Sequence, residues 1–308
     1  MKTRNLAAKR SLKFILAIAC VNLFTFTYAP GANAQSKEVT KVSFTKDKFN
    51  RIFLPAKINK DTVAVLFGTY SPTLRLSPYF AEEWELYPGW GGVTETSKIG
   101  RRQNRMLFYL PQMQIGNIKF RNEETILNHA FPDSIATGST GTLLVYQYNW
   151  RIDNDRNEVS ISKEPFESAN AQTYTTIKYK NTTPPLAAVE IAEAKADFII
   201  DLGSGANFQV NTGSDLGKKL IETYRLKPVN TITSNLHSRK TIDTIYEVTV
   251  PSLTFNGKEL KNQKVTISSA SPQNIIGTGF LGNYNVILNN SKKKKIESSM
   301  ILEKRLVD

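Results

Sequence analysis

The chain has 308 residues and a formal net charge of +13 at pH 7, from 40 lysines and arginines against 27 aspartates and glutamates. Its only cysteine is Cys20, which excludes a disulfide framework or a thiol nucleophile in the rest of the chain. The three tryptophans are scattered, and no stretch interleaves basic with aromatic residues. The positive charge therefore indicates a solvated surface and not a nucleic-acid-binding footprint.

The N-terminal segment has the features of a secretory signal peptide. A basic start precedes the largely apolar segment Phe14–Ala29, and Ala32–Ala34 provides small residues for cleavage. We therefore expect residues 1–34 to be removed on export to a bacterial periplasm or the extracellular space, with no stable membrane insertion afterwards. A lipoprotein signal ending at Cys20 is disfavoured because the apolar run continues past it. An uncleaved anchor fits less well, since the run is short and contains Asn22.

Cleavage at this site would leave 274 of the 308 residues, enough for one large domain or two small lobes. The first 34 residues hold five of the 40 basic residues and no acidic one. The remainder therefore has 35 basic and 27 acidic residues, a net charge of +8.

Along the chain, short runs of β-branched and aromatic residues separated by turn residues predict strands, for example at 62–67, 245–250 and 285–288. Only two segments have helical signals. Ser77 and Pro78 open one that we expect to reach Glu85, and Ser214 opens another that reaches Tyr224. The chain is therefore expected to be mostly β.

The same pattern occurs twice in the chain. First, Ile58–Phe67 matches Ile191–Ile200 at an offset of 133. Next, Pro111–Ile115 with Asn122 matches Pro251–Phe255 with Asn262 at an offset of 140. Last, Gly141-Thr142 with Tyr148-Asn149 matches Gly277-Thr278 with Tyr284-Asn285 at an offset of 136. Three matches in chain order are hard to explain by chance. They predict two homologous β lobes, 35–166 and 172–308, joined by the polar connector Glu167–Gln172.

Three segments of the second lobe carry a resemblance to a known family. They are FIIDLGS at Phe198–Ser204, NIIG at Asn274–Gly277, and FLGNYNV at Phe280–Val286, the last followed by a lysine-rich turn. Their order resembles that of the aspartic peptidases of the pepsin and retropepsin type, over nearly the whole of the chain after residue 34. The resemblance implies an all-β fold of two aspartic-protease-like β-barrel lobes, with a short helix in each.

In that family each lobe contributes one aspartate. Two carboxylates about 3 Å apart share one proton, so that one acts as base and the other as acid. The resemblance implies that Asp201 is the catalytic aspartate of the second lobe. It further implies that Gly203 and Ser204, with Thr69 and Ser71 of the first lobe, form the substrate-binding loops.

The first lobe departs from the family pattern. In the repeat alignment Gly68 takes the place of the first aspartate and Tyr70 that of a glycine, while Leu202 replaces a bracing threonine in the second loop. Asp61 lies too far along its strand to substitute. One member of the dyad is missing, and a lone Asp201 is expected to titrate near the ordinary pKa of about 4 unless burial raises it. Tyr70 either fills the space above the absent carboxylate or is a packing residue.

Two basic clusters have alternative interpretations. The arginines of the first lobe's flap-like hairpin would either meet an acidic ligand or be solvated, and we favour solvation (Arg101, Arg102 and Arg105). Lys292–Lys295 would be either a solvated hairpin turn or a specific anion site, and we favour the turn.

Other chemistries are not supported by the sequence. His129 and His237 are the only histidines and lack neighbouring ligands, so neither a metal nor another cofactor is expected. Ser204 lies in no Gly-x-Ser-x-Gly elbow, and Thr137–Gly141 lacks the lysine of a phosphate loop.

Three functions follow from these observations. The first is an exported pseudoprotease that binds extended peptides or unfolded protein segments between its lobes, with little or no cleavage. The second is an active aspartic endopeptidase in which homodimerisation brings two copies of Asp201 together. The third is a β-rich structural or surface-interaction protein.

Overall fold

The computed structural model describes residues 38–96, 102–127, 136–169, 171–179, 184–236, 239–269, 272–291 and 297–306. Val39–Asp308 form one compact unit. The predicted signal peptide, residues 1–34, lies outside the described residues. In the part of the chain that the structure describes, no helix combines the length and apolar character needed to cross a bilayer.

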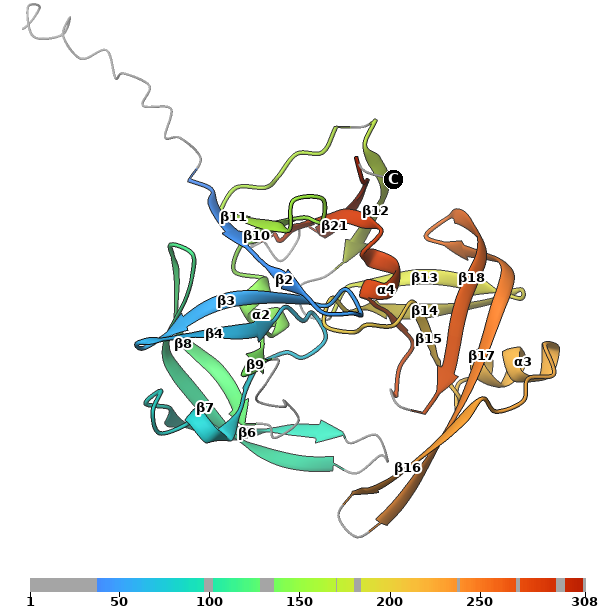
Figure 1. The fold of residues 1–308 in the computed structure, drawn as a ribbon, viewed down its shortest axis with the longest axis horizontal. Coiled ribbons are helices and arrows are strands. Elements are labelled where there is room, and N and C mark those ends of the chain that lie inside the picture. Colours follow the sequence, from blue (N-terminus) through green and yellow to red (C-terminus); the bar gives the residue numbers. More distant parts are fainter. Residues whose placement is uncertain are drawn as a thin grey trace, which may run out of the picture. The chain divides into compact units, whose positions relative to one another are not determined.

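The first lobe is built on a closed β-barrel (Figure 1). Its sheet begins with β2 (Thr45–Lys46) and continues in the order β3 (Ile52–Ile58), β4 (Asp61–Leu66), β9 (Gly138–Ser139), β5 (Leu74–Leu76), β8 (Ile118–Leu127), β7 (Arg102–Ile115) and β6 (Tyr87–Thr96). Pairing of Lys57 with Gln114 joins β3 to β7 and closes the barrel. Side chains alternate along β3, with Leu54 and Ala56 buried and Lys57 exposed, as expected for a strand with one face in the core.

The second lobe repeats this order. Its sheet runs β13 (Leu186–Ile191), β14 (Ala194–Ile200), β19 (Ile275–Ile276), β15 (Phe208–Asn211), β18 (Lys258–Ser268), β17 (Arg239–Phe255) and β16 (Asn230–Leu236), and β13 also pairs with β17. In both lobes the strand before the central loop pairs in parallel with a two-residue strand, β4 with β9 and β14 with β19. The predicted all-β class with two repeated barrel lobes is confirmed.

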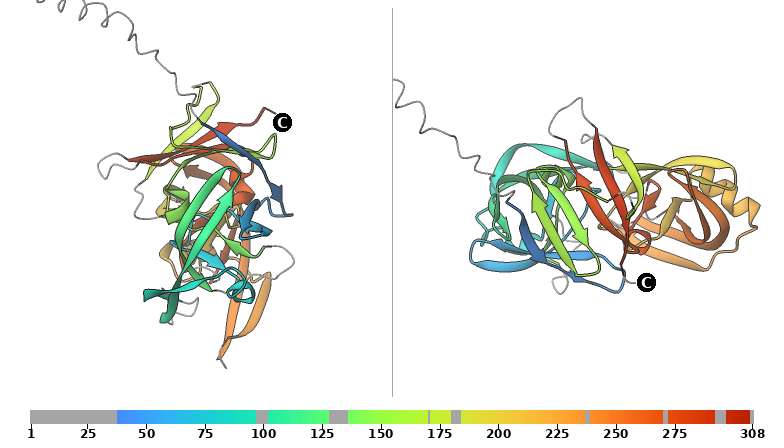
Figure 2. Two further views of the ribbon diagram at one scale, coloured as in Figure 1. Left: turned by 90° about the vertical axis from the view of Figure 1, so that its left-hand side faces the viewer. Right: turned by 90° about the horizontal axis from the view of Figure 1, so that it is seen from above.

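A third sheet combines strands from both halves of the chain. Its order is β1 (Thr40–Ser43), β11 (Glu158–Ser162), β10 (Asn149–Asp153), β20 (Tyr284–Asn289), β21 (Ser298–Lys304) and β12 (Thr173–Tyr179). Seen from above, the green strands β10 and β11 lie beside the red strands β20 and β21 (Figure 2). We call the first barrel with β1, β10 and β11 the first lobe, and the second barrel with β12, β20 and β21 the second lobe.

Reciprocal asparagine contacts join the two lobes across the third sheet. Asn149 Oδ1 accepts a hydrogen bond from the backbone N–H of Asn290 at 2.7 Å, and Asn285 Oδ1 accepts one from Asn154 at 2.6 Å. Asn290 and Asn154 in turn donate from Nδ2 to the carbonyls of Tyr148 and Tyr284. We call these four asparagines the asparagine clamp. The repeated Tyr-Asn pairs of the sequence thus form equivalent contacts in opposite directions.

The helices are shorter and more numerous than predicted. The second predicted helix is confirmed as α3 (Asp215–Thr223), where Ser214 Oγ accepts from Gly217 N–H as the N-cap. The prediction of a helix reaching Glu85 is wrong, because only the 3₁₀ turn η1 (Pro78–Phe80) forms there, followed by further turns. Two four-residue helices were not predicted, α2 (Thr142–Val145) and α4 (Thr278–Leu281).

Candidate functional site between the two lobes

Two loops meet where β4 and β14 end. Gly68–Ser71 continues the first strand after Phe67, and Asp201–Ser204 continues the second. The three residues before Asp201 are buried, so the strand brings the loop out of the core of the second lobe. Because β4 and β14 each pair with a short parallel strand, both loops leave equivalent positions in their barrels.

The Asp201 carboxylate is held by backbone donors from both lobes. Its Oδ1 accepts from Gly203 N–H at 2.8 Å and from Thr69 N–H at 3.3 Å. Thr69 also braces the second loop, since its hydroxyl donates to the Ile200 carbonyl at 2.9 Å and accepts from Leu202 N–H at 3.1 Å. Leu202, the equivalent residue of the second loop, has no hydroxyl and so cannot make the same hydrogen bonds to the first loop.

The side of Asp201 that faces the first lobe meets Gly68 and not a second carboxylate. Thr140 Oγ1 accepts from Gly68 N–H at 2.9 Å and donates to the Gly68 carbonyl at 3.0 Å. A Cβ atom at Gly68 would lie 3.6 Å from the Thr140 carbonyl oxygen and 4.0 Å from Asp201 Oδ1, both ordinary van der Waals contacts. The loop therefore has space for a Cβ atom at this position.

Burial raises the pKa of the Asp201 carboxyl above its ordinary value. The N–H groups of Gly203 and Thr69 and the positive charge of Arg75 oppose that rise. Burial also raises the pKa of the Tyr70 phenol. The negative charge of Asp201 raises that pKa further, while the positive charge of Arg75 lowers it. Asp201, Tyr70 and Arg75 therefore interact electrostatically. Burial, the condition under which Asp201 was expected to depart from an ordinary pKa, is the largest cause of its shift.

The predicted ligand-binding residues divide into two kinds. Thr69 is fully buried, and Ser71 is 8% exposed with its hydroxyl donating to the Thr73 carbonyl and accepting from Arg75 Nε. Both side chains are engaged within the protein, so we expect them to support the loop and not to touch a ligand. Gly203 and Ser204 are half-buried. The Ser204 hydroxyl accepts from Ala206 N–H at 3.4 Å, a long contact that leaves it free to accept again.

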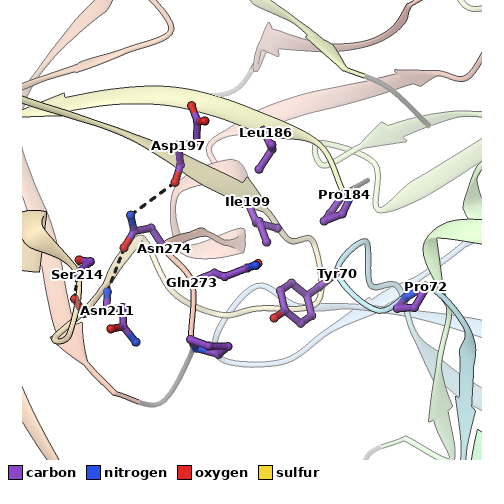
Figure 3. Close-up of a pocket in the computed structure, with 11 residues that line it drawn as sticks. Tyr70, Pro72, Pro184, Leu186, Asp197, Ile199, Asn211, Ser214, Gln273 and Asn274 are labelled. Atoms are coloured by element: carbon purple, nitrogen blue, oxygen red, sulfur yellow. Dashed lines mark hydrogen bonds between the residues drawn. The ribbon is translucent and has the colours of Figure 1, made fainter. Parts of the chain in front are cut away.

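A cavity of about 550 Å³ lies between the loop of the first lobe and the second lobe. It is lined by Tyr70, Pro72, Pro184, Leu186, Asp197, Ile199, Asn211, Ser214, Pro272, Gln273 and Asn274. Figure 3 shows the Tyr70 ring reaching from the first-lobe loop toward the second-lobe residues of the wall. Of these residues the sequence had marked Tyr70 as a departure from the repeat, Ile199 and Asn274 as parts of the two motifs of the second lobe, and Ser214 as a helix start, but it did not predict that they line one cavity.

The remaining predicted features contribute less to the site. Arg105 lies opposite Val93 in the hairpin of β6 and β7. The described ranges contain no group of three or more histidine, cysteine, aspartate or glutamate side chains that would hold a metal ion. Several predicted features lie outside the described residues: Arg101, both histidines (His129 and His237) and Lys292–Lys295.

No protein-family model matches this chain, and no curated protein sequence matches it.

Proposed function

We propose that this protein is an exported, aspartic-peptidase-like pseudoprotease that binds extended peptide segments between its lobes without cutting them. The observation that carries the proposal is the position of Gly68 beside Asp201. A dyad needs a second carboxylate at that point to share a proton, and Gly68 has no side chain.

The lone carboxyl is a poor catalyst on chemical grounds. An aspartate that takes a proton from water needs a partner acid that donates one to the substrate. General acid or base assistance is worth roughly 10²- to 10⁴-fold, so loss of one partner leaves at most a slow residual reaction. The groups that do approach Asp201 Oδ1 are the N–H donors of Thr69 and Gly203, which bind the ionised carboxylate and deliver no acid.

Binding is supported by the cavity and by strand edges. A volume of about 550 Å³ falls within the range of ligand pockets, and its walls include prolines, Leu186 and Ile199. β6 and β16 each end the order of their sheet, so each leaves one edge unpaired among the described strands. Such edges bind extended peptides through main-chain hydrogen bonds, while a cavity selects a side chain.

The contacts of the loops favour this proposal over an active homodimer. Pairing of two Asp201 loops would require the Gly68–Ser71 loop to leave first. That step breaks the contacts of Thr69 with Asp201, Ile200 and Leu202. If the protein has a purely structural role, its cavity binds no peptide, so a peptide-binding experiment separates that role from the proposed one.

Peptide binding is tested with pools of random octapeptides, labelled and titrated with the purified protein by fluorescence polarisation. Leu186 lines the cavity and is 40% exposed, so Leu186→Lys should place a charge in the site without disrupting the core. Val229→Lys is the matched control, because Val229 is 59% exposed and does not line the cavity.

We expect binding of at least one pool, weakened about tenfold or more by Leu186→Lys and unchanged by Val229→Lys. Absence of binding to every pool would overturn the proposal. Equal affinities of the wild type and Leu186→Lys would also overturn it, because the bound peptide would then lie elsewhere.

Export has its own test. The protein isolated from an expressing bacterium should begin at Gln35 when its N-terminus is sequenced, and should be found outside the cytoplasm. Retention of residues 1–34 on a cytoplasmic protein would refute this part of the proposal.

A further inference from the structure

We infer that Tyr70 determines which peptides the cavity accepts, and that the cavity takes an aromatic side chain with a polar edge, tryptophan or tyrosine, stacked against the Tyr70 ring. This inference rests on the proposed peptide-binding function and specifies the ligand of that site.

The two lobes differ at the position of Tyr70. Its counterpart in the second lobe is Gly203, where a Cβ atom would lie 3.1 Å from Gly68 Cα and 3.2 Å from Asp201 Oδ1. The second loop therefore has little space for a side chain, whereas the first loop carries a large ring at the equivalent position. That ring lines the cavity, so it contributes a wall that the repeat alone would not supply (Figure 3).

The apolar part of the wall suits a flat ligand group. Pro72, Pro184 and Pro272 line the cavity together with Leu186 and Ile199. Proline rings are rigid, so they lose little conformational entropy when a ligand packs against them. Aromatic rings bury a large area in a rigid shape and gain further energy when they pack against another ring. An aromatic side chain is thus the group that this wall and Tyr70 bind together most favourably.

The polar part of the wall favours a ligand with one hydrogen-bonding atom. Asn274 Oδ1 accepts from Asn211 N–H at 3.1 Å, and Asn274 Nδ2 donates to the Asp197 carbonyl at 3.5 Å (Figure 3). A side-chain amide offers two lone pairs and two N–H bonds, so each end of Asn274 retains capacity for one more partner. An indole N–H or a phenol O–H at the edge of the ligand ring would use that capacity, whereas phenylalanine would leave it unused.

The experiment uses six pools of random octapeptides, each with one fixed central residue: Trp, Tyr, Phe, Leu, Ala or Asp. Each pool is titrated by fluorescence polarisation with the wild type, Tyr70→Phe, Tyr70→Ala and Tyr79→Ala. Tyr79 is 71% exposed and does not line the cavity, so it is the matched control for loss of a tyrosine. Thermal unfolding of every variant verifies that each one is folded.

The Trp and Tyr pools should bind about ten- to hundredfold more tightly than the Ala pool, with the Phe pool between them. Tyr70→Ala should abolish that preference, while Tyr70→Phe and Tyr79→Ala retain it. If peptides bind with equal affinity across the pools, or if folded Tyr70→Ala keeps the preference, the inference is wrong although peptide binding stands. If no pool binds, the proposed function itself fails.

Discussion

Asp201 and Gly68 mark the point at which the two lobes diverge in chemistry. Asp201 remains in a loop that holds its carboxylate with two N–H groups, although burial raises its pKa. A Cβ atom at Gly68 would make only ordinary van der Waals contacts, so packing at the Cβ position does not require glycine. The sequence alone predicted that Gly68 and Asp201 occupy equivalent positions in the two lobes, because they align in the repeat. The effect of burial on Asp201 could not be predicted, since it depends on residues of both lobes.

A raised pKa in the folded protein makes Asp201 a pH-dependent element of stability. Folding favours the neutral carboxyl relative to the unfolded chain, so its stabilising contribution is present below the unfolded pKa of about 3.9 and is lost as the pH rises through the folded pKa. Asp201→Asn should therefore have a higher melting temperature than the wild type at pH 7. The increase should be about 2–4 °C for each kcal/mol by which the substitution raises the free energy of unfolding.

This difference between Asp201→Asn and the wild type should shrink toward zero near pH 3, where both side chains are neutral. Thermal unfolding monitored by circular dichroism at intervals between these pH values measures it. A wild type more stable than Asp201→Asn at pH 7 would contradict the raised pKa.

Gly68→Asp should create a dyad. A Cβ atom at this position would lie 4.0 Å from Asp201 Oδ1 and meet no closer contact than 3.6 Å, so the substitution starts without a backbone clash and carries its carboxyl on the side of Asp201. Two adjacent carboxyls cannot both ionise readily, and one would act as acid. We expect peptide cleavage at acidic pH at least about 10²-fold above the wild type.

The matched control is Gly68→Asn, which has nearly the same size without the charge and should stay inactive. The double variant Gly68→Asp/Asp201→Asn should be inactive as well. Equal rates for Gly68→Asp and Gly68→Asn, with both folded, would show that a second carboxyl is insufficient to restore the chemistry.

Among the secondary-structure elements, the strands were predicted more accurately from their apolar patterns than the helices were from their capping signals. The strand predicted at 62–67 is β4, and the segment Ile245–Val250 lies within β17. The helix α3 has a Ser cap and two turns of pattern, which a sequence can show. By contrast α2 and α4 have four residues each, which is too short for a helical period to be detectable. The turn η1 has the Ser-Pro start of a helix, but the chain leaves it after one turn.

The asparagine clamp should contribute strongly to stability, because the two hydrogen bonds that Asn149 and Asn285 accept are buried. Asn149→Ala removes the acceptor for Asn290 N–H, and Asn285→Ala removes the acceptor for Asn154 N–H. Each change should lower the free energy of unfolding by about 1–3 kcal/mol, measured by urea denaturation.

Asn230→Ala is the control for the clamp, since Asn230 is exposed and its side chain accepts a local hydrogen bond from Thr231 N–H. Its free energy of unfolding should stay within about 0.5 kcal/mol of the wild type. Clamp variants as stable as this control would show that the contacts do not hold the lobes.

At the scale of the whole molecule, the duplication could be predicted because matching segments recur in chain order. The cavity could not, since its walls come from segments far apart in the sequence, and the motifs that Ile199 and Asn274 belong to do not indicate an open space beside them. The third sheet was not predicted either. It joins strands from both lobes, with β10 against β20 at its centre. Neither lobe completes this sheet alone.

Each half of the chain should therefore stay bound to the other after the connector is cut. A protease recognition sequence inserted at Glu167–Gln172 allows the cut, and the halves should co-elute from a size-exclusion column under native conditions and separate only in urea. The hydrogen bonds between Phe166 and Asn289, at 2.9 and 2.8 Å, add to the β10–β20 pairing that holds them. Separate elution without denaturant would mean that the third sheet is too weak to hold the lobes.

In the proposed function, the site binds peptides and does not cut them. The most direct measurement incubates a diverse peptide library with the wild type and with Asp201→Asn across roughly pH 3 to 7, the range in which carboxylate dyads operate, and identifies new termini by mass spectrometry. We predict that a folded wild type generates no termini beyond those found with Asp201→Asn. New termini made by the wild type and absent with Asp201→Asn would contradict the claim, because Asp201 would then have found a catalytic partner.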